Sequence, residues 1–224
     1  MSIGPSSGDE QNGPEPFTLW IIESLNMDKK PLAEVESLSD EELISRFQND
    51  DLICYDLLVR RYKDQLLNFA YRFLGNVEEA EDVVQETFLR LFRKRHAYRQ
   101  IAKFSTWIYT IAGNLAKTEL RKRKRRKLVS ISDLGFDERE FEIEDEGSDT
   151  ERQANSSMTD KIIQQAIAEL SPRFRQVIIL RDIQELSYEE IGSILRIPLG
   201  TVKSRVNRAR LKLQSKLKEI KPIK

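Results

Sequence analysis

The spacing of apolar residues predicts helices through most of the chain. From Ser39 to Arg126, apolar residues recur three or four positions apart, which places them on one face of a helix. No alternating run of β-branched residues, the pattern of a strand, interrupts this stretch. The clearest apolar stripe consists of Leu57, Leu58, Tyr62, Leu66, Phe69 and Phe73. The pattern therefore favours an all-α fold.

Capping and helix-breaking residues divide this stretch into separate helices. Ser39 and Glu42 have the spacing of a capping box, so a helix is expected to begin there. The pair Gly75-Asn76 then interrupts the apolar stripe. We expect a second helix from about Val77 to Arg95 and a third from about Ser105 to Arg126.

A second helical module follows an acidic segment. Residues 128–157 are rich in carboxylates and have no apolar period, as in a flexible linker. Beyond them, Ser171-Pro172 offers an N-cap followed by proline at the first helical position, and Ser187 with Glu190 forms another capping box. At the other end, a Gly-, Pro- and Ser-rich start predicts disorder. The expected divisions are a disordered extension over 1–38, a helical domain over 39–127, the flexible acidic linker over 128–157 and a second small helical domain over 158–220.

Charge is balanced over the whole chain but unevenly distributed along it. The chain has 37 Lys and Arg residues against 37 Asp and Glu residues. Residues 121–127 are seven consecutive cations, residues 133–151 hold ten carboxylates and one arginine, and residues 201–218 carry seven cations and no acid. Such blocks are consistent with polyanion-binding surfaces separated by an acidic connector, although solvated helix faces have a similar composition.

The composition gives no support for a metal site, a disulfide, a membrane-spanning helix or a catalytic site. The single cysteine, Cys54, lies among apolar residues and is expected to be a buried thiol, and with the single histidine, His96, it argues against a zinc site. No apolar run approaches the about 20 residues of a membrane-spanning helix, and no signal peptide is evident. We also find no Gly-rich phosphate loop and no Ser/His/Asp constellation. A soluble cytoplasmic protein that is not an enzyme and needs no cofactor or metal is expected.

The second domain ends in a predicted helix-turn-helix. A helix capped by Ser187 is expected to run to about Leu195, followed by a tight turn with Pro198 and Gly200 and then by a longer helix. One stripe of the longer helix is expected to be buried, namely Val202, Val206, Ala209, Leu213 and Leu217.

A separate stripe of this longer helix is cationic. It contains Thr201, Arg205, Arg208 and Lys212, with Lys203, Ser204 and Asn207 beside it. Cations neutralise phosphates, whereas Arg, Ser and Asn side chains can reach base edges in the major groove. A basic helix that only packs on its own domain would carry the same charges, but the Pro/Gly turn before it favours DNA binding.

Residues 191–210 (IGSILRIPLGTVKSRVNRAR) resemble the motif with which bacterial sigma factors read the promoter −35 element, especially those of the extracytoplasmic-function group. Residues 166–182 resemble the helices that support this motif. Arg196 departs from the family, which commonly has glycine there; with a positive φ, arginine would cost on the order of 1 kcal/mol. The resemblance implies −35 contacts by Thr201, Lys203, Ser204, Arg205 and Arg208, and Lys212 continues their cationic stripe.

The predicted helix over 77–95 carries two different stripes. The inward one is formed by Ala80, Val84, Phe88 and Leu91. The other is both acidic and apolar, which suits a contact with a helix of another protein, although the outer face of any soluble bundle looks similar. The segment AEDVVQETFLRLF resembles the sigma-factor helix that binds the clamp helices of the largest RNA polymerase subunit. The resemblance implies contacts with core polymerase by Asp82, Gln85, Glu86 and Leu89.

Residues 98–126 combine aromatic and basic side chains. Such a combination can hold single-stranded DNA, because bases stack or enter pockets while cations follow the backbone; Ile108, Ile111 and Leu115 are expected in the core instead. The segment resembles the −10 reading and melting region of sigma factors, with Asn114 near the pocket for a flipped base; Gln100 and Ile101 depart from the family pattern. The implied −10 contacts are Lys103, Phe104, Ser105, Thr106, Trp107, Asn114, Lys117 and Arg121.

The two motifs occur in the order found in the sigma-70 family, and the resemblance covers residues 39–127 and 158–218. It implies a two-domain sigma factor that binds core RNA polymerase and promoter DNA, duplex at −35 and single-stranded at −10, and assists promoter melting. It also implies an anti-sigma factor as a usual partner, and no insertion into a membrane. The alternative is a free-standing helix-turn-helix regulator that binds a palindromic duplex without polymerase. The strand-binding segment and the Asp82/Gln85 stripe argue against that alternative.

Overall fold

The computed structural model describes residues 35–132 and 158–219. Within these ranges the structure is helical and contains no strand, as the apolar pattern predicts. The chain divides into a unit of residues 1–37 and a unit of residues 38–224, and every helix discussed below belongs to the second unit. Nearly all of the expected extension over 1–38, and most of the expected linker over 128–157, lies outside the described residues.

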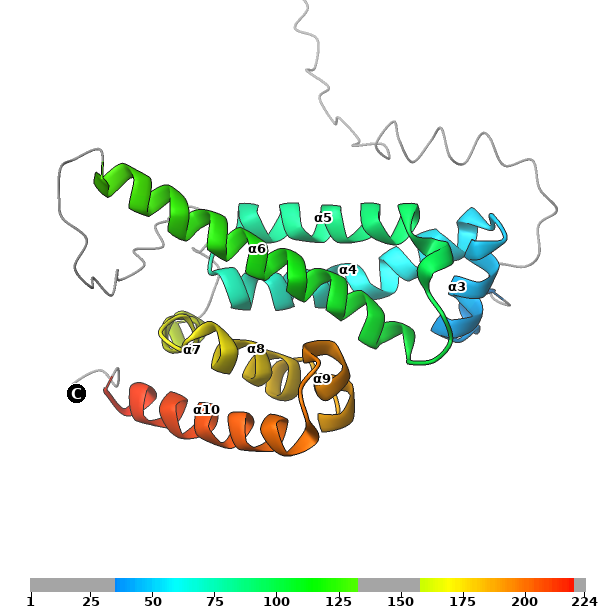
Figure 1. Ribbon diagram of the computed structural model, residues 1–224. Coiled ribbons are helices and arrows are strands. Elements are labelled where there is room, and N and C mark those ends of the chain that lie inside the picture. The colour runs from blue at the N-terminus through cyan, green and yellow to red at the C-terminus, as the bar shows by residue number, and fades with distance from the viewer. Residues whose placement is uncertain (1–34, 133–157, 220–224) are drawn as a thin grey trace, which may run out of the picture. The chain divides into compact units, whose positions relative to one another are not determined.

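The first half of the second unit is built from four longer helices, labelled in Figure 1. They are α3 (Asp40–Gln48), α4 (Leu52–Leu74), α5 (Val77–Arg93) and α6 (Phe104–Ser132), and a short 3-10 helix (Arg95–Ala97) follows α5. Helix α4 packs against α3, α5 and α6. The predicted apolar stripe of α4 forms the centre of this core, with Leu58, Leu66, Phe69 and Phe73 fully buried.

Capping side chains set the starts of these helices as the sequence predicts. The Ser39 hydroxyl accepts a hydrogen bond from the Glu42 N–H (3.3 Å), and the Glu42 carboxylate accepts one from the Ser39 N–H (2.8 Å). Gly75 ends α4 with a left-handed φ of 77°, a conformation that costs glycine little. The Asn76 side chain then caps α5.

Two predicted helix ends differ from the structure. Helix α5 ends at Arg93 rather than near Arg95, and the chain continues as the short 3-10 helix. Helix α6 continues to Ser132, so the first residues of the expected linker are helical. It begins at Phe104, whose N–H donates to the Glu41 carboxylate of α3 (2.9 Å). A residue distant in sequence therefore caps this helix.

The second half contains α7 (Met158–Ala168), α8 (Pro172–Ile178), a π-helical turn (Ile179–Ile183), α9 (Tyr188–Leu195) and α10 (Leu199–Glu219). Helix α10 runs alongside α8 (Figure 1) and also contacts α7. The Ser187–Glu190 capping box is confirmed, and Pro172 begins α8 as predicted, although the Ser171 side chain makes no capping bond. Gly200, predicted in the turn, lies in α10 instead.

Side chains also join the two halves of the 38–224 unit. The buried Arg175 of α8 donates to the Phe73 carbonyl of α4 (2.6 Å), and the Tyr109 hydroxyl of α6 donates to Gln184 (2.6 Å). A β-carbon added to Gly113 of α6 would lie 2.7 Å from Gln176 Nε2, so these helices approach closely at that point. No described helix is long and apolar enough to cross a membrane.

Candidate nucleic-acid and protein interfaces

Helix α10 has the two stripes that the sequence predicts. Val202, Val206 and Ala209 are buried, and α10 packs on α7, α8 and α9 through this side. Leu213 and Leu217 are only half-buried, so the apolar contact weakens toward the end of the helix. The packing holds α10 against its own domain along one side and leaves the cationic stripe available.

The predicted −35 residues lie on the accessible part of α10. Lys203, Ser204, Arg208 and Lys212 are exposed, whereas Thr201 and Arg205 are half-buried. Lys212 also places its ammonium 5.9 Å from the centre of the Phe174 ring, which supports its stem. Five of the six predicted residues, all but Lys203, therefore share one side of one helix, as a major-groove contact requires. Helical spacing places Lys203 on the other flank of the buried stripe.

The turn before α10 contains an arginine in an uncommon conformation. Arg196 ends α9 with φ 53° and ψ 50°, in the left-handed region where glycine is usual. Its N–H donates to the Gly192 carbonyl and closes the last turn of α9. Arg196 therefore has the positive φ at which arginine is expected to cost on the order of 1 kcal/mol.

Helix α5 presents a mixed stripe to solvent. Asp82 and Gln85 are exposed, Leu89 is 47% exposed, and Glu86 is half-buried. The Glu86 carboxylate pairs with Arg90 (2.7 Å), and this hydrogen bond lowers the Glu86 pKa below its usual value. The opposite stripe, Ala80, Val84, Phe88 and Leu91, is buried as predicted.

Phe92 is a further accessible apolar residue of this surface, one that was not predicted from the sequence. Its ring is 39% exposed although it also contacts the rings of Phe47 and Tyr55. Phe92 follows Leu89 by three residues, so the two apolar side chains are neighbours on α5. The i, i+3 spacing of Leu89 and Phe92 in the sequence could have indicated that the two side chains share this surface.

The aromatic residues of the predicted −10 segment are mostly buried. Phe104 is fully buried against Tyr62, Tyr98 and Trp107, and Thr106 is 7% exposed. The prediction that these two side chains contact DNA therefore needs correction, because they form the support for the loop before α6. Trp107 and Ser105 are half-buried and keep an accessible part. Ile108 is buried as predicted, and Ile111 and Leu115 are half-buried.

The polar residues of the segment lie at different points along α6. Lys103, just before the helix, pairs with Glu190 of α9 (3.0 Å), which raises the Lys103 pKa. Asn114 and Arg121 are exposed. Half-buried Lys117 has a lowered pKa because of burial and the nearby cations Arg121 and Arg205. The accumulated positive charge around Lys117 favours an anionic ligand.

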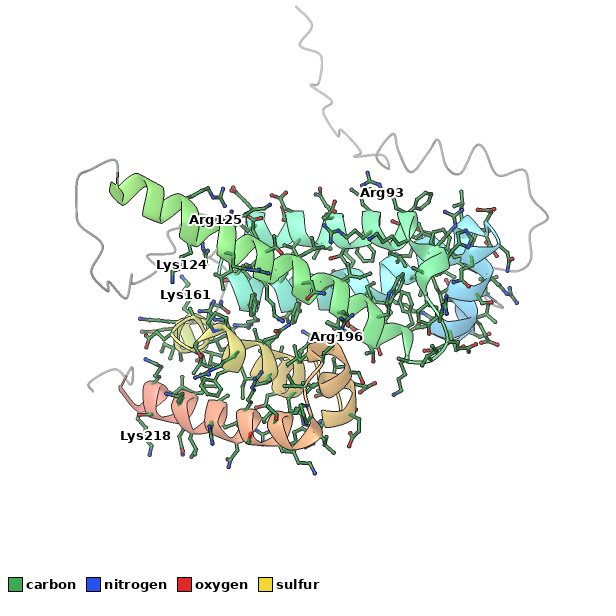
Figure 2. All side chains as sticks on the ribbon, in the orientation of Figure 1. Arg93, Lys124, Arg125, Lys161, Arg196 and Lys218 are labelled. Carbon is green, nitrogen blue, oxygen red and sulfur yellow. The ribbon has the colours of Figure 1, made fainter. Side chains whose placement is uncertain are left out.

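The cations of the 121–127 run fall into two groups, one paired with acidic side chains and one lining a hollow. Arg123 and Arg126 pair with Glu79 of α5, and Lys122 pairs with Glu119. Arg121, Lys124 and Arg125 line a shallow hollow with Thr118; Lys124 and Arg125 are labelled in Figure 2. Lys124 and Arg125 were not assigned to the −10 surface individually, although the charge run includes them. In residues 35–132 and 158–219, no group of three His, Cys, Asp or Glu side chains could hold a metal ion.

Comparison with known proteins matches both helical parts of the chain to family models. Residues 58–126 match the family described as Sigma-70 region 2, and residues 160–213 match the family described as Sigma-70, region 4. The chain belongs to the sigma-70 family. This sigma factor contains the family's two regions in order, and both matches lie within the expected domains 39–127 and 158–220.

Its relatives place it in the extracytoplasmic-function group. The sigma factor is 37% identical over 179 residues to the ECF RNA polymerase sigma factor SigW of Bacillus subtilis, covering 79% of this chain and 96% of the relative. It is also 37% identical over 175 residues to the RNA polymerase sigma-H factor of Pseudomonas aeruginosa, covering 76% and 90% of the two chains.

A solved structure has a similar fold. The sigma factor RpoE in a complex with the anti-sigma factor NepR from Bartonella quintana is 29% identical, with a TM-score of 0.56, covering 73% of this chain and 96% of that one. As a sigma factor, the protein directs RNA polymerase to promoters, and a free-standing regulator is not favoured.

Proposed function

We propose that this sigma factor divides polymerase binding, −10 capture and −35 reading among α5, the start of α6 and α10. The observation that carries the proposal is the separation of three accessible polar surfaces on three helices whose opposite sides are buried. The domain over 39–127 would hold the first two surfaces, and the domain over 158–220 the third. The surface of α5 is acidic and apolar, which suits a protein partner, whereas the surfaces of α6 and α10 are cationic, which suits DNA.

Helix α10 is proposed to lie in the major groove of the −35 element. The exposed Lys203 and Arg208 can contact phosphates or base edges, and Ser204 can donate to either. Thr201 and Arg205 are half-buried at the border of the apolar stripe, so they would contact DNA at the edge of the interface. Lys212, two turns further along, would contact a phosphate.

The start and exposed side of α6 are proposed to hold the opened −10 strand. Asn114 would contact a flipped base, with Trp107 and Ser105 beside it, while Lys117 and Arg121 follow the backbone. Lys103 would exchange its pairing with Glu190 for a phosphate. Buried Phe104 and Thr106 would act by positioning the loop.

Helix α5 is proposed to bind core polymerase through Asp82, Gln85, Glu86 and Leu89. Leu89 supplies apolar area, and the acidic side chains supply orientation against a cationic partner. We further propose that the chain works in the cytoplasm beside polymerase, performs no covalent step itself and is held inactive by an anti-sigma factor. The complex of the Bartonella relative with NepR supports the last point.

Run-off transcription with purified bacterial core polymerase and a library of promoter fragments tests these assignments. The variants are Asp82→Ala/Gln85→Ala, Asn114→Ala and Arg205→Ala/Arg208→Ala, with Glu78→Ala and Lys218→Ala as controls. Glu78 is an exposed acid in the first turn of α5, and Lys218 an exposed cation at the end of α10 (Figure 2). Lys218 lies on α10 outside the tested stripe. Glu78 lies one turn before Asp82 on the same side of α5, beyond the four predicted contacts, so it tests whether the contact ends at Asp82.

The three variants are expected to fail at different steps. Asp82→Ala/Gln85→Ala should lose co-purification with core polymerase, and Arg205→Ala/Arg208→Ala should lose promoter binding. Asn114→Ala should retain promoter binding but lose permanganate-reactive thymines in the −10 region. Wild-type transcription by all three variants would refute the assignments. Polymerase-independent binding to a palindromic duplex, without any transcript, would favour the free-standing regulator.

A further inference from the structure

Arg196 has a backbone conformation that its side chain does not explain. Three described residues other than glycine have a positive φ, namely Asp50, Glu185 and Arg196. Asp tolerates this region because its short side chain can bond locally, and Asp50 also pairs with Arg95 (2.5 Å). Arg196 has neither advantage. A strained residue that gives its own fold no visible contact is a candidate for a contact with a ligand.

The guanidinium of Arg196 makes no hydrogen bond or ion pair with the residues that the structure describes, and the residue is exposed. Two other arginines of the same module are engaged within the chain. Arg210 donates twice to Asp182 (2.5 and 2.9 Å), and Arg181 donates to the Leu186 carbonyl (2.8 Å). Arg196 therefore retains a full set of donors for a partner outside the chain.

Its position is at the entrance to the recognition helix. Arg196 lines a shallow hollow with Gly192, Ser193, Pro198 and Leu199, where α9 ends and α10 begins; Figure 2 labels it beside α9. Glu189 also lines the hollow, but it lies seven residues earlier on α9, about 10 Å away by helical rise. The cationic end of the hollow is thus the end next to α10.

We propose that Arg196 holds a backbone phosphate of promoter DNA at the border of the −35 element. This inference rests on the proposed −35 reading by α10. The first residues of a recognition helix enter the major groove, so the turn just before them meets the phosphates that border it. A guanidinium suits this task because its fork of donors matches a phosphate, and Gly at this position could not make the contact.

Salt-dependent binding by the reconstituted holoenzyme tests the proposal. The probe is a promoter fragment that run-off transcription identifies. Arg196→Gly and Arg196→Asn are expected to bind it roughly threefold to tenfold more weakly, and the slope of log K against log salt should become shallower by about 0.9, the value for one phosphate. Arg196→Lys should keep most of the slope. Neutral methylphosphonate linkages placed singly along the −35 duplex should weaken wild type at one position and leave Arg196→Gly unaffected there.

Glu185→Gly is the matched control, because it also removes an exposed side chain at positive φ (56°). Both glycine variants should melt at the wild-type temperature or about 2–4 °C higher, since strain is relieved. Only Arg196→Gly should lose DNA affinity. An unchanged slope for Arg196→Gly, with binding lost in Arg205→Ala/Arg208→Ala, would overturn the phosphate contact and leave the −35 assignment intact. If Arg205→Ala/Arg208→Ala also binds normally, both proposals fail.

Discussion

Cys54 is the only thiol of the chain and is fully buried near the start of α4. Burial, with a hydrogen bond to the Asp51 carboxylate (3.3 Å), raises its pKa to about 12. The folded state therefore favours the neutral thiol more than the unfolded state does. This contribution to stability is complete below about pH 9 and decreases as the pH rises toward 12. We expect the urea midpoint of wild type to fall across that window more steeply than that of Cys54→Ala.

A native-state thiol reaction provides the control for this prediction. At pH 8, Cys54 should react with a water-soluble disulfide reagent only after urea unfolds the chain, because its sulfur is inaccessible and protonated. Equal pH dependence of wild type and Cys54→Ala between pH 9 and 12, or rapid labelling of the folded protein, would contradict the assignment of a buried, high-pKa thiol.

At the scale of the element, the same capping box begins two helices with different roles. Ser187 caps α9, which supports the recognition helix, and Ser39 caps α3, which lies outside every proposed surface. Ser187→Ala and Ser39→Ala should each lower the free energy of unfolding by about 0.5–2 kcal/mol, because each removes one capping hydrogen bond. Only Ser187→Ala should also weaken binding of the holoenzyme to −35 DNA. Urea unfolding and promoter-binding titrations measure the two effects.

The comparison between the two serine variants is what tests the role of α9. Equal DNA affinity in both would show that fraying of α9 does not disturb α10. Unchanged stability in both would mean that water replaces the lost caps without cost. Ser187→Asp should rescue both properties, since aspartate is an equally good N-cap.

At the scale of the whole molecule, polar contacts connect α4 and α6 with the helices that follow residue 157. The Tyr109 hydroxyl is 2.6 Å from Gln184 Oε1, and the residue is 2% exposed. We expect one cooperative thermal transition for the 38–224 unit, followed equally by helical circular dichroism and by Trp107 fluorescence in a Trp20→Phe background. Tyr109→Phe should lower the stability of this transition by about 1 kcal/mol, the net value of one buried hydrogen bond.

A hydroxyl that bonds within α3–α6 provides the matched control. Tyr55 donates to the Phe88 carbonyl (3.3 Å), so Tyr55→Phe tests a bond that does not cross between the two halves. If the halves unfold separately, two transitions would be resolved, and Tyr55→Phe would move only the one that Trp107 reports. That result would exclude a single cooperative unit.

The sequence by itself determined the features that depend on neighbouring residues. The helical period, both capping boxes, the Gly75-Asn76 break and the two stripes of α10 follow from contacts between residues at most a few positions apart. The exposed stripe of α5 was predictable for the same reason, because helical geometry alone separates Asp82 and Leu89 from the buried Val84. Family resemblance then supplied their roles.

The tertiary structure decided what depends on residues distant in the chain. Glu41 sets the start of α6 from another helix, and Phe104 is buried because Tyr62 and Tyr98 surround it. Neither contact has a local signal, so the sequence assigned Phe104 to the DNA surface. The sequence alone left open whether Arg196 has a positive φ. In the structure it is left-handed because the chain turns there from the end of α9 toward α10. Local periodicity specifies which side of a helix is apolar, whereas only the packed chain decides which polar and aromatic groups remain accessible to polymerase and DNA.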